Sequence, residues 1–226
     1  MTGTHKHQTH APGSERDTSR LEAFSDGVFS IAITLLVLEF RILPAPDLRI
    51  ALLKLGPSFF AYVLSFVTIG VYWARHHYIF KFYRYTNHML NLLNLLFLMF
   101  ISLLPFPTKV LAEYLRHGKD AKTAATFYSV GLFLPALSWF LTWLYASRHQ
   151  QIIDPHLDPK FIRKLTVVYA VTVTLYFAGI VMSLIDYKLG LCVSVGLTLF
   201  YILPPLAPIY LPEEQLEEEP PLRKVA

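Results

Sequence analysis

Two ionisable residues stand at the start of a long apolar segment. Arg20 and Asp26 precede a mostly apolar run over residues 28–38, and the whole stretch is long enough to cross a membrane as a helix. A carboxylate inside lipid is costly, so such a group usually has a partner and a task. We therefore expect the function of this chain to depend on the contacts of Asp26 and on the surface that the apolar residues face.

Asp26 has two possible structural roles. In the simpler one, Ser25 or Asp26 caps the helix by accepting backbone N–H groups, and Gly27 allows close approach of the backbone in either role. In the other, Asp26 joins a buried hydrogen-bond network that fixes the helix to its neighbours. The next two apolar segments supply partners: one ends Tyr-Trp-Ala-Arg-His-His77, and the other carries Asn91 and Asn94 on one helix face.

The aliphatic residues of the first helix form a stripe. At about 100° per residue, Ile31, Leu35 and Leu38 fall on one face, Thr34 lies about 60° to its side, and Asp26 about 140° away. In one interpretation the stripe faces lipid or a neighbouring helix. In the other it lines a pore, where stacked aliphatic rings gate ions by dewetting and Thr34 adds hydroxyls at one level.

The composition is that of a membrane protein. The 226 residues are 54% hydrophobic and 16% charged, with a mean hydropathy of +0.43, and long apolar runs indicate several membrane crossings. The net charge of +4 does not indicate nucleic acid as a partner, because much of the basic charge lies in short loops between apolar runs. The single Cys192 excludes a disulfide or a cysteine metal site within one chain. We expect no metal site and no cofactor.

The hydropathy pattern predicts an all-α, polytopic membrane protein with six transmembrane helices. Polar tails over 1–18, expected to be disordered, and 212–226, which is acidic, flank a membrane domain over 19–211. The six predicted spans cover residues 20–41, 51–74, 88–107, 123–146, 163–185 and 188–211.

Prolines mark several of these spans. We expect Pro105 and Pro107 to close the third helix, Pro135 to kink the fourth, and the prolines of 204–208 to distort the end of the sixth. An even number of spans places both termini on one side. Twelve Lys and Arg residues fall on that side and eight on the other, which favours cytoplasmic termini and a multi-pass protein of the cell membrane.

The first helix resembles a known family signature. The pattern Arg20-x-x-x-Phe24-Ser25-Asp26, followed by Ile-Ala-Ile-Thr-Leu-Leu-Val-Leu-Glu, is similar to that of transmembrane protein 175, the lysosomal potassium channel family, and to its bacterial homologues. The Tyr-Trp-x-x-His-His stretch and the asparagine helix ending Leu-Pro-Phe106 also fit, and six spans cover the chain as in one bacterial subunit.

The resemblance implies a homotetramer in the lipid bilayer, with the first helices lining a central pore and K⁺ as the permeant ion. By position, the hydrophobic constriction maps to Ile31, Leu35 and Leu38, and the potassium preference to Thr34. The packing network of the family maps to Arg20, Phe24, Ser25 and Asp26, with Trp73, His77, Asn91 and Asn94 as further members. The absence of a Thr-Val-Gly-Tyr-Gly run agrees with a channel that lacks a re-entrant selectivity loop.

Two rivals come from other classes. A proton-coupled transporter or proton leak would use Asp26 and His77 as a relay, a role that intramembrane carboxylate and imidazole pairs do serve. An intramembrane enzyme has no support, because the sequence has no His-Glu-x-x-His, no Gly-x-Ser-x-Gly and no paired carboxylates at membrane depth.

Overall fold

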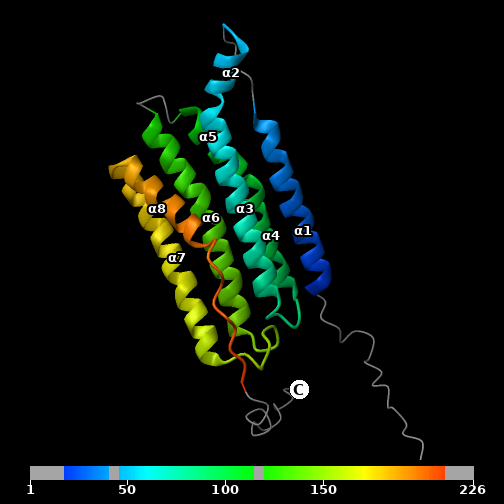
Figure 1. Cartoon of the computed structure of the whole chain (residues 1–226). Helices are drawn as coiled ribbons and strands as arrows, with labels where there is room; N and C mark the ends of the chain where they lie inside the picture. Colours follow the sequence, from blue (N-terminus) through cyan, green and yellow to red (C-terminus); the bar gives the residue numbers. More distant parts are fainter. Residues whose placement is uncertain (1–17, 41–45, 115–119, 212–226) are drawn as a thin grey trace, which may run out of the picture.

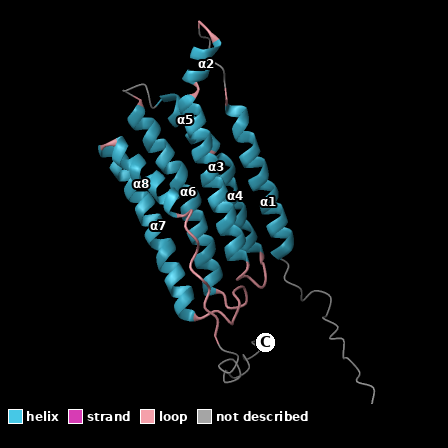
Figure 2. Cartoon of the chain, in the orientation of Figure 1, coloured by secondary structure: helices cyan, strands magenta, loops and turns pink. Residues whose placement is uncertain are grey.

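Helices make up most of the computed structural model, which describes residues 18–40, 46–114 and 120–211 (Figure 2). Within these ranges no strand is present beyond isolated β-bridges, so the all-α prediction is confirmed. The predicted tails lie outside the described residues, except that Thr18 already begins the first helix. In chain order the elements are α1 (Thr18–Leu35), η1 (Leu36–Glu39), α2 (Leu48–Lys54), α3 (Gly56–Phe80), α4 (His88–Leu103), α5 (Pro105–Tyr114), α6 (Ala121–Arg148), α7 (Pro159–Ile185) and α8 (Tyr187–Phe200).

Side chains in the short loops start several of these helices. Asp47 and Asn87 accept the backbone N–H of the residue three positions on, at 2.9 Å in each case, and so cap α2 and α4. Asp158 and Asp186 do the same two positions on, at 2.7 and 2.8 Å, for α7 and α8. Each cap fixes where a helix enters the bundle.

The apolar helices agree in number with the six predicted spans. Among the described residues, five stretches are long and apolar enough to cross a membrane: Thr18–Leu38, Ser58–Phe80, His88–Tyr114, Ala121–Arg148 and Pro159–Ile185. The sixth, α8, has 14 residues. The chain is therefore a multi-pass membrane protein.

The predicted end of the sixth span is wrong. We expected a helix to residue 211, but α8 stops at Phe200 and residues 201–211 are not helical. Pro204, Pro205 and Pro208 explain the difference, because proline has no N–H to donate and its ring clashes with the preceding turn. The prolines replace the helical end rather than distorting it.

The third span ends differently from the prediction. Helix α4 stops at Leu103, before the prolines as expected, but a second helix, α5, begins at Pro105 and includes Pro107. Proline is tolerated in the first turn of a helix, where its missing N–H has no intrahelical partner to lose. Pro135 lies inside α6, which continues through it.

The helices form a bundle around α6, which packs against α4, α5, α7 and α8 (Figure 1). Successive spanning helices alternate in direction, so the start of α1, the α3–α4 loop and the α6–α7 loop lie at one end, called here the terminal end. Leu211 lies there too, because its N–H donates to His156 in the α6–α7 loop. The first and last described residues of the chain therefore lie at the same end of the bundle; the termini themselves lie outside the described residues. The packing of α7 on α8 is tight at Gly190, where an added Cβ would lie 2.4 Å from the Cβ of Ser183.

The first helix sits at the edge of this bundle. It packs mainly on α3 and α4, and through η1 on α3 again. Figure 1 shows α1 on the outside of the bundle, separated from α7 and α8 by the other helices. One long face of α1 is consequently left open.

Candidate functional site

Two faces of α1 differ sharply in burial. Ser25, Phe29 and Ala32 are at most 3% exposed and, with Leu36, follow a spacing of four, three and four residues toward α3 and α4. Ile31 and Leu38, on the predicted stripe, are 60% and 71% exposed. Within one chain the stripe therefore contacts little, which is expected of a face turned to lipid or to a pore and not of one packed on a neighbouring helix of the same chain.

A change of helix type aligns the end of the stripe. The α-helix ends at Leu35 and continues as the 3₁₀-helix η1, with Leu35 at φ −68° and ψ −20°. In a 3₁₀-helix, side chains three residues apart eclipse each other. Leu38 therefore stands directly in line with Leu35, closer in angle than the α-helical wheel of the sequence predicts.

Thr34 lies beside the stripe, and its hydroxyl proton is already used in hydrogen bonds to the backbone of its own helix. Its Oγ1 donates to the carbonyl oxygens of Ser30, at 2.9 Å, and Ile31, at 3.0 Å. A hydroxyl has one proton and two lone pairs, so the oxygen remains free to accept. The residue is exposed, and it presents an acceptor oxygen at the level of the aliphatic side chains.

A buried hydrogen-bond chain fixes the other face of α1. Ser25 Oγ donates to the carbonyl of Leu21 at 2.7 Å and accepts from Asn94 Nδ2 at 2.9 Å. Asn94 Oδ1 in turn lies 3.0 Å from His76 Nε2. Ser25, Asn94 and His76 are all at most 1% exposed, so three helices are joined by polar groups that have no access to solvent.

His76, and not the predicted His77, is the histidine that joins this junction. The His76 ring stacks on Phe80 at 4.1 Å between centroids and meets Phe29 edge-on at 5.6 Å, whereas His77 is exposed. The signal that favours His76 is helical spacing: Ile69, His76 and Phe80 repeat at seven and four residues along the buried face of α3.

Asp26 has a different partner from those of Ser25. The indole Nε1 of Trp73 donates to Asp26 Oδ1 at 2.9 Å, which links α3 to α1 about one turn from His76. Both residues are exposed in the single chain. The capping role considered for Ser25 or Asp26 is wrong, because α1 begins at Thr18 and both residues lie well inside the helix. Asp26 instead acts within its own chain as an acceptor for a neighbouring helix.

The remaining predicted members of the network are not brought into it. Arg20 and Phe24 are exposed on α1. Asn91 shares α4 with Asn94, but its Oδ1 is buried without a hydrogen-bond partner. No group of three or more His, Cys, Asp or Glu side chains that could hold a metal ion occurs in residues 18–40, 46–114 and 120–211.

Comparison with known proteins gives a family for this arrangement. The family model for the endosomal/lysosomal potassium channel TMEM175 matches residues 20–105, which include α1, α3 and α4. A potassium channel of Streptomyces collinus is 36% identical over 82% of this chain and 91% of its own length. A potassium channel of Chamaesiphon minutus is 37% identical over 84% of this chain and 95% of its own.

A solved structure and a vertebrate protein are also similar to this chain. The crystal structure of a lysosomal potassium-selective channel TMEM175 homolog from Chamaesiphon minutus superposes with a TM-score of 0.72, at 36% identity, and covers 82% of this chain and 96% of that one. The human endosomal/lysosomal proton channel TMEM175 is 34% identical over 58% of this chain but only 28% of its own length. By its sequence, its fold and the two faces of its first helix, the chain belongs to the TMEM175 family.

Proposed function

We propose that this chain is one subunit of a homotetrameric, potassium-preferring cation channel of the cell membrane, with α1 lining the pore. The two bacterial relatives that match almost over their full lengths are potassium channels, and the matching crystal structure is that of a potassium-selective channel. Conduction in this proposal is passive and needs no cofactor.

The observation that carries the proposal is the open stripe on α1. Ile31, Leu35 and Leu38 project away from a well-packed subunit at the edge of the bundle. Four copies arranged around an axis would bring these side chains together as three stacked apolar rings. Such rings hold back ions by excluding water, and a modest turn of the helices would widen them.

Thr34 supplies the polar element of the proposed pore. Its proton is donated to its own helix, so its oxygen faces outward as an acceptor. Four such oxygens near the Ile31 ring would contact a partly hydrated cation. Hydroxyl oxygens in place of a carbonyl cage predict moderate selectivity.

The orientation follows from charge. The terminal end carries the larger share of Lys and Arg, which favours its placement in the cytoplasm. The aliphatic rings lie in the second half of α1, toward the opposite end of the bundle. The proposed constriction therefore belongs to the outer half of the membrane.

Potassium flux from liposomes tests the gate. Ile31→Asn makes the ring polar and should raise flux, because water then remains in the constriction. Val37→Asn is the control, since Val37 is 54% exposed but turned about 120° from Leu38 in the 3₁₀-helix. Equal flux from wild-type protein and Ile31→Asn would overturn the gate assignment. Native mass spectrometry of the 25.9 kDa chain tests the tetramer separately.

The proton-relay alternative is not favoured by the geometry. Asp26 accepts from an indole N–H, which is a donor only and cannot pass a proton on. His77 is exposed, and the imidazole that is buried, His76, is bonded to an amide. The same liposomes with a pH-sensitive dye measure proton flux directly.

A further inference from the structure

The segment Tyr201–Leu211, called here the strap, crosses part of the membrane depth without being helical. It follows α8 and runs to the terminal end, where the backbone N–H of Asp158 donates to the carbonyl of Ile209 at 3.0 Å and Leu211 donates to His156 at 2.8 Å. Backbone outside a helix at this depth must find hydrogen-bond partners in the protein. Its three prolines have no N–H, and the N–H groups of Tyr201, Ile202 and Leu203 bond back to the end of α8, so the carbonyls of the strap need donors from elsewhere.

Helix α3 supplies the donors for those carbonyls. Arg75 Nη2 donates to the carbonyl oxygens of Tyr201 at 3.0 Å and Leu203 at 2.6 Å. The hydroxyl of Tyr78 donates to the carbonyl of Leu206. An ionised donor makes a stronger hydrogen bond than a neutral one, so Arg75 is the firmer of the two clamps.

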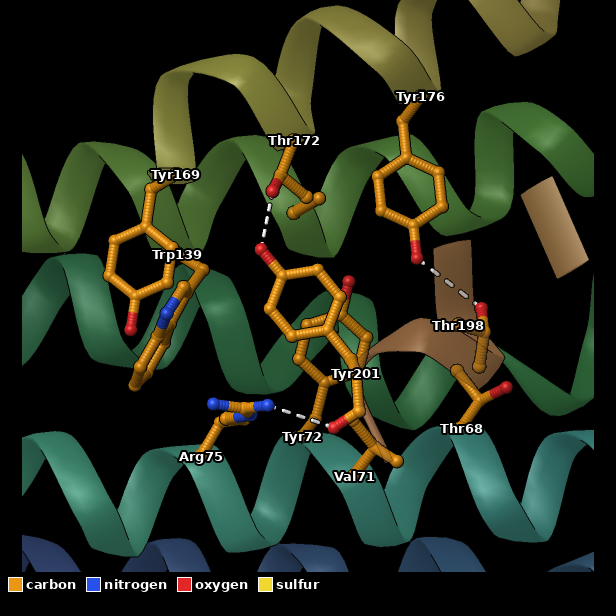
Figure 3. Close-up of a pocket in the computed structure, with 11 residues that line it drawn as sticks. Thr68, Val71, Tyr72, Arg75, Trp139, Tyr169, Thr172, Tyr176, Thr198 and Tyr201 are labelled. Carbon is orange, nitrogen blue, oxygen red and sulfur yellow. Dashed lines mark hydrogen bonds between the residues drawn. The ribbon is translucent and has the colours of Figure 1, made fainter. Parts of the chain in front are cut away.

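The first strap residue is also anchored by its side chain. The Tyr201 hydroxyl bonds Thr172 of α7, and the Arg75 guanidinium lies 5.0 Å from the centre of the Tyr201 ring (Figure 3). The ring forms one wall of a cavity of about 40 Å³ between α3, α6, α7 and α8, so it is not closely packed on every side. Polar contacts, more than packing, hold this end of the strap in place.

The loop that receives the other end of the strap is held by a carboxylate. Asp154 accepts the backbone N–H of His156 at 3.0 Å, and its Oδ1 lies 2.7 Å from His156 Nδ1. Burial alone would raise the pKa of Asp154, but the hydrogen bonds and charge of His156, together with Arg84, hold that pKa below its usual value.

The clamp residues and the anchors of α1 stand on the same short stretch of α3. Trp73 bonds Asp26 of α1, and His76 reaches Ser25 of α1 through Asn94. Arg75 and Tyr78 alternate with them and face the strap. Less than two helical turns of α3 thus hold the pore helix on one side and the strap on the other.

We propose that the docked strap restrains α3 and, through Trp73 and His76, restrains the pore helix, so that Arg75 and Tyr78 are positioning residues for gating. The inference rests on the proposed function of α1 as the pore helix. Loosening the strap frees α3 to move with α1 and raises the fraction of time the channel is open. It leaves ion preference unchanged, because no strap residue belongs to the pore-facing stripe.

Tyr78→Phe tests the clamp by removing one hydroxyl. The loss of a single hydrogen bond predicts a rise of about two- to tenfold in the open-to-closed ratio in planar bilayers, with an unchanged reversal potential. Hydrogen exchange should quicken at the Leu211 and Asp158 amides and also in α1. Tyr62→Phe, a tyrosine on the same helix away from the strap, is the matched control and should change neither quantity. Arg75→Gln should act in the same direction as Tyr78→Phe and more strongly.

A double-mutant cycle tests the route through α3. Trp73→Phe removes the bond to Asp26, so adding Tyr78→Phe in that background should change the open-to-closed ratio less than it does alone. Fully additive effects, or faster exchange in the strap with no change in α1, would overturn the inference. If the wild-type protein conducts no potassium, the proposed function is wrong instead. Hydrogen exchange in α1 would still decide whether the strap restrains that helix.

Discussion

Replacing Asn94 by leucine should weaken the subunit more than any other single change to its polar network. Asn94 is fully buried and makes two side-chain hydrogen bonds, one to Ser25 on α1 and one to His76 on α3. Leucine is close to asparagine in size, so the substitution removes both bonds and opens little space. The interior is left with polar groups that have lost their partners.

The structure gives the size of this effect. Hydrogen bonds between membrane helices average about 0.6 kcal/mol and reach about 1.7, so two such bonds contribute about 1–3 kcal/mol. Ser25 keeps its bond to the carbonyl of Leu21, but the His76 nitrogen is left unpaired, which adds about 1–3 kcal/mol. The greater apolar surface of leucine offsets part of the loss. We expect a net decrease of about 2–3 kcal/mol in the free energy of unfolding, toward the upper end of an ordinary point substitution.

Unfolding in mixed micelles of dodecyl maltoside and SDS measures this free energy. The matched control is Asn91→Leu, one turn away on α4, because Asn91 Oδ1 is buried without a partner and its removal breaks no bond at that oxygen. Asn91→Leu should be neutral or stabilising. Similar losses in the two variants, or no loss in Asn94→Leu, would show that the Ser25–Asn94–His76 chain does not hold α1 in place.

Three further substitutions probe other parts of the fold. Gly190→Ala should destabilise the protein by about 1–3 kcal/mol, because its Cβ would overlap α7, whereas Gly196→Ala, with nothing within 4 Å of the added atom, should have little effect in the same unfolding assay. The pKa of Asp154 is lowered in the folded state. Its stabilising contribution is therefore present above the ordinary carboxyl pKa and is lost as pH falls through the folded pKa. The difference in melting temperature between wild type and Asp154→Asn should shrink on acidification, and a constant difference would contradict this. Thr34→Val should lower the preference for K⁺ over Na⁺ by about two- to tenfold in reversal potentials, with Thr34→Ser retaining it; equal preference in both variants would remove Thr34 from the ion path.

The sequence predicts the membrane helices well because their signal is local. Apolar length defines α1 with η1, α6 and α7 to within a few residues, whereas α3 starts five residues later and ends six residues later than the predicted span 51–74. The other errors fall where proline acts by position. Pro105 follows the end of α4 and also starts α5, which the sequence did not predict, and α8 stops at Phe200, ahead of the prolines of 204–208. In each case the outcome depends on whether the N–H of that residue would have had a partner.

The two faces of α1 could also be read from spacing, since Ser25 and Ile31 differ in direction on any helical wheel. The hydrogen-bond partners that these residues have on other helices could not be predicted from spacing. His76 and His77 are adjacent in sequence, and only the rotation of α3 against α4 decides which of them reaches Asn94. Asn91 and Asn94 share a face, yet only Asn94 meets Ser25. Wheel geometry gives a direction but not the depth at which two helices cross.

The short helix α8 makes the subunit unequal toward the two leaflets of the bilayer. At 14 residues α8 extends about 21 Å, against about 30 Å for the hydrocarbon core. Lipids of one leaflet therefore meet a regular helix there, while those at the terminal end meet the strap. Exposed Leu203, Pro205 and Ile209 give that segment an apolar outer surface, and its carbonyls are turned inward to α3. At this position the apolar surface is completed by the side chains of the strap instead of by helix length, so a change in bilayer thickness is expected to be felt first by that segment.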